Sequence, residues 1–271
     1  MAGTIQRHPV SPVSALRLFF VAGWRSNLAL FRWMRPSAFI PTLIGVPALQ
    51  LIFFVHLGRY LDTQPVSYYA LGNALHACAM AGLFAPAMSL AGERFAGTLP
   101  ALLATPANRT LMFAGRTVTA VLVGCSSTVV MLILGSVLTD FRLPAEGIVP
   151  ISAAILVTAA SCSAFGLLVG AAGLRTREAI LLGNLVLYLM LLVCGINIPR
   201  ESLPDGLRLI GEIMPMTHGI AAARQAFTGS GPVTGLLLVE LGKGLSFLVL
   251  AVLTLRFLER GSRRAASLDE V

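Results

Sequence analysis

Charged side chains are scarce in this chain. Asp, Glu, Lys and Arg together make up 12% of its 271 residues, and Lys243 is the only lysine. A soluble domain of this length would carry about twice that share of charge. Hydrophobic residues reach 56%, with a mean hydropathy of +0.82. The composition therefore excludes an ordinary soluble globular protein and indicates a membrane protein.

Metal-binding and nucleotide-binding patterns are also missing. The four cysteines (Cys78, Cys125, Cys162 and Cys194) form no C-x-x-C pair and have no nearby His at metal-ligand spacing. We therefore expect no metal site. Gly242-Lys243-Gly244 lacks the hydroxyl residue and the strand–loop–helix context of a phosphate-binding loop. We expect no cofactor on this chain, and any ATP it depends on must be hydrolysed by another polypeptide.

Long apolar runs recur along the sequence instead. A helix that crosses a hydrocarbon core of about 30 Å needs about 20 such residues. Six runs qualify: 38–57, 69–91, 111–139, 147–174, 179–198 and 233–257. The sequence predicts one all-α, polytopic membrane domain over 1–271 with six transmembrane helices.

The N-terminal segment 14–35 mixes leucines and aromatic residues with Arg17, Arg25, Arg32 and Arg35 at roughly helical spacing. This pattern favours a helix that lies in the membrane interface. A basic tail before the first span is the simpler alternative.

The arginines predict the orientation. With six spans and a cytoplasmic N-terminus, 14 of the 19 arginines fall on the inner side and 5 on the outer side. The positive-inside rule then places both termini in the cytoplasm. The arginine-dominated composition suggests a GC-rich bacterium, so we expect the chain in a bacterial plasma (inner) membrane. Contact with anionic lipid accounts for the net charge of +8, so no nucleic-acid partner is expected.

A short polar interruption, 93–106, separates the second and third spans on the cytoplasmic side. Thr98 can cap a short helix, and Pro100 is tolerated in its first turn. Leu99, Leu102 and Leu103 give that helix one apolar face. Thr105-Pro106 ends it, because a residue before proline avoids the α region.

This segment, ERFAGTLPALLATP, resembles the pattern E-R-x-x-G-T-L-x-x-L-L-x-T-P of type-2 ATP-binding-cassette (ABC) exporter permeases. The resemblance implies a coupling helix that docks on a separate cytoplasmic ATPase subunit. It also implies two such ATPases, which bind ATP and Mg, and a second copy of this or a related permease. Pro100 departs from the family, which often has an acidic residue there.

Within this segment the leucines would bury in the partner's groove. Glu93 and Arg94 could pair with charges at its rim, and Gly97 would allow close approach or a tight turn. Alternatively, Glu93 and Arg94 pair with each other or with lipid headgroups.

The segment 199–232 is too polar to span. It is broken by Pro199, Pro204 and Pro215, and it contains His218 and Arg224. It resembles the family's extracellular re-entrant segment before the last span, where an arginine commonly follows. We expect short helices that dip into the outer leaflet and act as an extracellular gate. A simple surface cap is the alternative.

Two charges fall inside the last predicted span. Glu240 and Lys243 lie at i, i+3, close enough to neutralise each other. The pair could contact substrate or an opposite protomer, or it could be a structural ion pair facing another helix. His56 and His76 also fall on apolar spans, where we expect hydrogen-bonded core residues.

The resemblance implies an ABC exporter permease for a hydrophobic or amphipathic drug, lipid or glycoconjugate, with antibiotic resistance as one role. The alternative is a secondary carrier or a membrane-embedded enzyme that needs no ATPase. The acidic residues are dispersed and no internal repeat is visible, so neither alternative finds support in the sequence.

Overall fold

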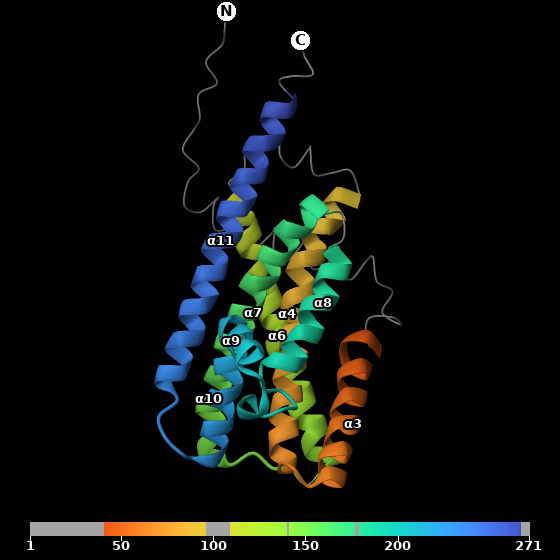
Figure 1. Ribbon diagram of the computed structural model, residues 1–271, viewed down its shortest axis with the longest axis vertical. Helices are drawn as coiled ribbons and strands as arrows, with labels where there is room; N and C mark the ends of the chain where they lie inside the picture. Colours follow the sequence, from red (N-terminus) through yellow and green to blue (C-terminus); the bar gives the residue numbers. More distant parts are fainter. Residues whose placement is uncertain (1–40, 96–108, 140, 177–178, 267–271) are drawn as a thin grey trace, which may run out of the picture.

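The computed structural model describes residues 41–95, 109–139, 141–176 and 179–266, and within these ranges it contains helices and no strands. Six apolar helices run along the long axis of the molecule in alternating directions (Figure 1). They are α3 (Val46–Leu61), α4 (Val66–Phe95), α6 (Arg109–Leu138), α7 (Ile148–Thr176), α8 (Ala179–Val193) and α11 (Thr234–Ala266). Three short helical segments precede longer helices: the π-helix η1 (Pro41–Gly45) and the 3-10 helices η2 (Ala145–Gly147) and η3 (Arg200–Ser202). The all-α prediction is confirmed.

Four of these helices are long and apolar enough to cross a membrane, with spans at Val66–Met88, Thr117–Leu138, Ala145–Gly173 and Thr234–Phe257. The other two, α3 and α8, are apolar but shorter. The 15 residues of α8 extend about 23 Å, less than a hydrocarbon core. Six crossings therefore remain a prediction.

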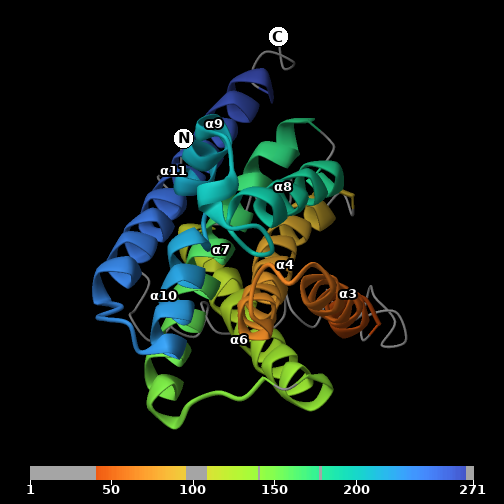
Figure 2. The same ribbon diagram turned by 60° about the horizontal axis from the view of Figure 1, so that its bottom comes forward.

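Helices α4 and α7 form the centre of the bundle, and α6 and α11 pack outside them (Figure 2). The buried core contains large side chains from α4 and α7, among them Leu71, Leu75, Leu83, Ile151 and Leu167. Exposed apolar side chains cover the outer faces of α3, α6, α8 and α11. This distribution suits a bundle surrounded by lipid.

Small residues allow the central helices to approach closely. A Cβ added at Gly166 on α7 would lie 2.6 Å from the carbonyl oxygen of Leu83 on α4, and one at Gly244 on α11 would lie 3.0 Å from the Cα of Ser161. Apolar side chains gain little by leaving lipid, so close backbone packing of this kind stabilises membrane bundles.

The predicted re-entrant segment holds two short helices, α9 (Asp205–Ile213) and α10 (Thr217–Thr228) (Figure 1). Helix α10 packs against α7 and α11, and α9 packs against α8. The described residues begin at 41, so the predicted interfacial helix 14–35 lies outside them. Residues 96–106 of the predicted coupling helix also lie outside.

Replacing Gly166 by Ala should destabilise the bundle by about 1–3 kcal/mol, because the added methyl group meets the backbone of α4 rather than a movable side chain. The measurement is the thermal midpoint of the detergent-purified chain. Gly242→Ala is the matched control, because its Cβ would meet no atom within 4 Å, and it should leave the midpoint unchanged or slightly raised. Equal midpoints for the two variants would contradict this packing.

Candidate functional site

The candidate site is the break between α9 and α10. Helix α9 ends at Ile213, Pro215 cannot donate a backbone hydrogen bond, and α10 starts at Thr217. Met216 between them has a φ of 79°, and Asp62 is the only other non-glycine residue with positive φ among the residues described. Such a conformation persists where the surroundings hold it in place.

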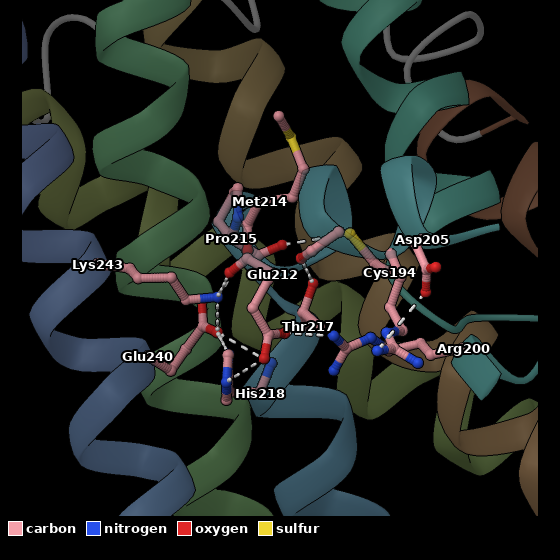
Figure 3. A network of polar contacts seen from close by, with 12 residues as sticks. Cys194, Arg200, Asp205, Glu212, Met214, Pro215, Thr217, His218, Glu240 and Lys243 are labelled. Carbon is pink, nitrogen blue, oxygen red and sulfur yellow. Dashed lines mark hydrogen bonds and ion pairs between the residues drawn. The ribbon is translucent and has the colours of Figure 1, made fainter. Parts of the chain in front are cut away.

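Glu240 of α11 binds the C-terminal side of this break, at the start of α10. One carboxylate oxygen, Oε1, accepts the Met216 N–H at 2.6 Å, and Oε2 accepts the His218 N–H at 3.2 Å (Figure 3). The Glu240 side chain is 0% exposed. A negative charge at a helix N-terminus satisfies unpaired N–H groups and interacts favourably with the helix dipole. The carboxylate thus stabilises the start of α10.

Lys243, one turn further along α11, holds the other side. Its Nζ donates to the Met214 carbonyl at 2.6 Å and lies 3.0 Å from Glu240 Oε2. The Thr217 hydroxyl donates to the Gly211 carbonyl at 2.5 Å. A cation at the end of α9 complements the unpaired carbonyls there. The pair therefore binds both ends of the break and fastens it to α11; we call this arrangement the Glu240–Lys243 clamp.

A second layer of charges surrounds the clamp. Arg200 in η3 forms a hydrogen-bonded ion pair with Glu212, which lies near the end of α9. His218 Nε2 lies 3.8 Å from Glu212 Oε1, and its Nδ1, which is buried and has no hydrogen-bond partner, lies 4.0 Å from Glu240 Oε2. Burial, followed by the Lys243 ammonium, lowers the pKa of His218 below its ordinary value, so the ring is neutral at pH 7.

Arg224 fastens α10 on the opposite side. Its guanidinium donates to the carbonyls of Gly195 (2.7 Å), Ile196 (2.9 Å) and Tyr68 (3.0 Å), and it lies 3.4 Å from the centroid of the Tyr68 ring. Burial lowers the pKa of Arg224 to about 10, which leaves it charged at neutral pH. Gly195, with a φ of 76°, turns the chain where α8 ends. This turn explains why α8 stops at Val193, short of the predicted boundary at 198.

The predicted site residues fall into two groups. Pro199 precedes η3, Pro204 precedes α9, and Pro215 lies in the break, so these three lie with His218 and Arg224 in one region. Glu240 and Lys243 join that region, and their contacts favour the structural ion pair of the two alternatives. Glu93 and Arg94 lie at the end of α4. Gly97, Thr98, Leu99, Leu102 and Leu103 lie outside the described residues.

Sequence reasoning missed a buried polar network on the other side of α4. Asn73 Nδ2 donates to Asn197 Oδ1 at 2.7 Å, and Gln50 Nε2 donates to Asn73 Oδ1 at 2.9 Å. Gln50 Nε2 also lies 3.0 Å from His76 Nδ1. The network joins α3 to α4 and to the turn after α8. Amide side chains inside apolar runs were the signal that could have predicted it.

Within the described ranges, no three His, Cys, Asp or Glu side chains are grouped so that they could hold a metal ion. The cysteines there are free thiols, and Cys194 donates weakly to the Pro215 carbonyl at 3.6 Å. The arrangement thus supplies hydrogen bonds and charge pairs that fix helix ends, and it brings together no nucleophile and base.

Comparison with known families identifies the scaffold. A family model described as ABC-2 type transporter matches residues 17–228. The chain belongs to the ABC-2 type transporter family. No curated protein matches it. As an ABC-2 type transporter with several apolar helices, it is a multi-pass membrane protein and a permease component, and its family implies association with an ABC ATPase. The match ends before α11, so the Glu240–Lys243 clamp involves residues beyond the matched range.

Replacing Glu240 by Gln with Lys243 intact should destabilise the chain by about 3–5 kcal/mol, because it leaves a poorly hydrated ammonium without its counter-charge. The measurements are the thermal midpoint and the yield of folded protein. Arg208→Gln is the control, because Arg208 pairs with Asp205 at 3.8 Å on an exposed surface, where a pair contributes about 0–1 kcal/mol. Equal losses from the two substitutions would show that the clamp contributes no more than a surface pair.

Proposed function

We propose that this chain is the transmembrane subunit of an exporter that moves a hydrophobic or amphipathic molecule out of the cytoplasm. ATP hydrolysis on a separate ABC ATPase drives it. Family membership supports the proposal, together with a sequence that has no phosphate-binding loop of its own. The partner subunits would bind ATP and Mg, and a drug, a lipid or a glycoconjugate would suit the apolar scaffold.

Six membrane crossings fit the arrangement of the apolar helices. Together η1 and α3 cover 41–61, about 30 Å of helix, which is enough for a first crossing. Helix α8 would cross most of the bilayer, and α9 and α10 would lie toward the outer side before α11 returns. Arg109, Arg175 and Arg256 then lie toward one end of the bundle, and the positive-inside rule makes that end cytoplasmic. Both termini would lie in the cytoplasm.

The segment 93–106 begins in the last residues of α4, at its cytoplasmic end, and stops before α6. In this position a short helix can be reached by a cytoplasmic ATPase. Leu99, Leu102 and Leu103 would bury in the ATPase, each contributing about 1.5–3 kcal/mol if fully buried. Two permease chains and two ATPases would enclose one pathway, and movement of the ATPases would pass through this segment into α4 and α6.

The helices α9 and α10 would form the outer gate. The observation that carries this assignment is the clamp, which attaches the break between α9 and α10 to α11 through a buried charge pair. Because the broken segment is fastened to α11 on one side and by Arg224 to α4 and the α8 turn on the other, a shift between these helices would move it. A gate requires this kind of attachment, and a passive surface cap does not.

The test is reconstitution of the chain in liposomes with the ABC ATPase that is encoded beside it or co-purifies with it. ATPase activity should be stimulated by some members of a panel of amphipathic compounds, and those compounds should be transported. Leu102→Asp should reduce stimulated activity at least about tenfold, because a carboxylate in an apolar groove loses the burial and adds a desolvation cost.

Leu61→Asn, at the exposed outer end of α3, is the matched control and should keep the activity. Transport by the purified chain without any ATPase would contradict the proposal and favour a secondary carrier.

A further inference from the structure

The His218 ring lies between two carboxylates that already have cationic partners (Figure 3). Glu240 has Lys243 at 3.0 Å, and Glu212 is bonded by Arg200. The ring nitrogens lie 4.0 Å from Glu240 and 3.8 Å from Glu212, beyond hydrogen-bond distance. The neutral ring therefore lies near both carboxylates and is hydrogen-bonded to neither.

The charges around His218 balance only while the ring is neutral. Arg200 and Lys243 supply two positive charges, and Glu212 and Glu240 supply two negative ones. Helix α7, which also packs against this turn of α10, presents the uncharged Thr158 hydroxyl beside Gly219. A proton on His218 would add one uncompensated positive charge at a side chain that is 13% exposed. Such a charge is costly where water is largely excluded.

We propose that His218 is a proton-sensing positioning residue, and that its protonation loosens the attachment of the α9–α10 break to α11. The imidazolium would compete with Lys243 for Glu240 Oε2, the oxygen that also accepts the His218 backbone N–H. Repulsion between the imidazolium and the ammonium would favour an arrangement in which His218 or Lys243 reaches water. The start of α10 would then lose part of its carboxylate cap.

The sign of the pH dependence follows from the surroundings of the ring. Burial and Lys243 lower the pKa of His218, and they outweigh the opposing effect of Glu212 and Glu240. A state in which the ring is solvated binds the proton more readily, so protonation favours that state. The clamped arrangement is therefore most stable above about pH 6.5, the ordinary pKa of His, and becomes less stable as the pH falls through this value.

The consequence for transport rests on the proposed function. If α9 and α10 form the outer gate, an acidic exterior would change the rate of export. The pH response of the α9–α10 break needs neither substrate nor ATPase, so it can be tested separately.

The experiment is amide hydrogen exchange of the full chain in lipid nanodiscs, followed in peptides that cover 214–220. The intrinsic exchange rate at each pH is divided by the measured rate to give protection factors. Between about pH 7.5 and about pH 5.5, which bracket the ordinary His pKa, protection in the wild type should fall by at least about threefold. His218→Gln removes the titrating group and should abolish the fall.

His56→Gln is the control. His56 is exposed on α3, away from the clamp, and its Nδ1 lies 2.9 Å from the Ile52 carbonyl oxygen. This variant should therefore show the same fall in protection as the wild type. A wild type with constant protection, or a His218→Gln variant with the same fall as the wild type, would overturn the inference.

Glu212→Gln provides a second test that does not depend on the folding of the His218 variant. Removal of this carboxylate leaves the surroundings of His218 with excess positive charge, so the midpoint of the fall should move to lower pH. An unchanged midpoint, or one at higher pH, would also overturn the inference. A normal pH response in a complex that fails to transport would count against the proposed function alone.

Discussion

Backbone groups in a bilayer must be hydrogen-bonded within the protein, and the break between α9 and α10 is where this requirement is hardest to meet. Three residues, one of which is a proline, separate the end of α9 from the start of α10. Glu240 and Lys243 meet the requirement together, because the carboxylate accepts N–H groups of α10 and the ammonium donates to a carbonyl of α9. Each charge also neutralises the other. The position of α9 and α10 relative to α11 depends on this pair.

The same logic governs the rest of the bundle. Because apolar burial adds little to helix association in lipid, α4, α7 and α11 rely on close backbone contact at Gly166 and Gly244. Side-chain hydrogen bonds fix which segments pack together. Arg224 donates to three carbonyls from two other segments, and Asn73 of α4 donates to Asn197. Backbone packing at the centre therefore holds the helices together, and side-chain hydrogen bonds determine which segments are joined.

Much of the fold was predictable from the sequence because long apolar runs and proline-broken polar runs indicate helices locally. The apolar ranges correspond to helices, and prolines at 204 and 215 mark the start of α9 and the break after it. Contacts between distant residues were harder to predict. The i, i+3 spacing predicts that Glu240 and Lys243 pair, but nothing local indicates that they bind Met216 and Met214. The early end of α8 depends on a turn that Arg224 stabilises from another helix, which a local pattern does not encode.

The central claim is that Glu240 and Lys243 act as one unit. A double-mutant cycle on the unfolding free energy, with Glu240→Gln, Lys243→Met and the double substitution, measures this directly. The account predicts a coupling energy of about 1–3 kcal/mol, with the double variant less destabilised than the two single losses added together. Losses that add to within about 0.5 kcal/mol would mean that the two charges act independently, which would contradict the account.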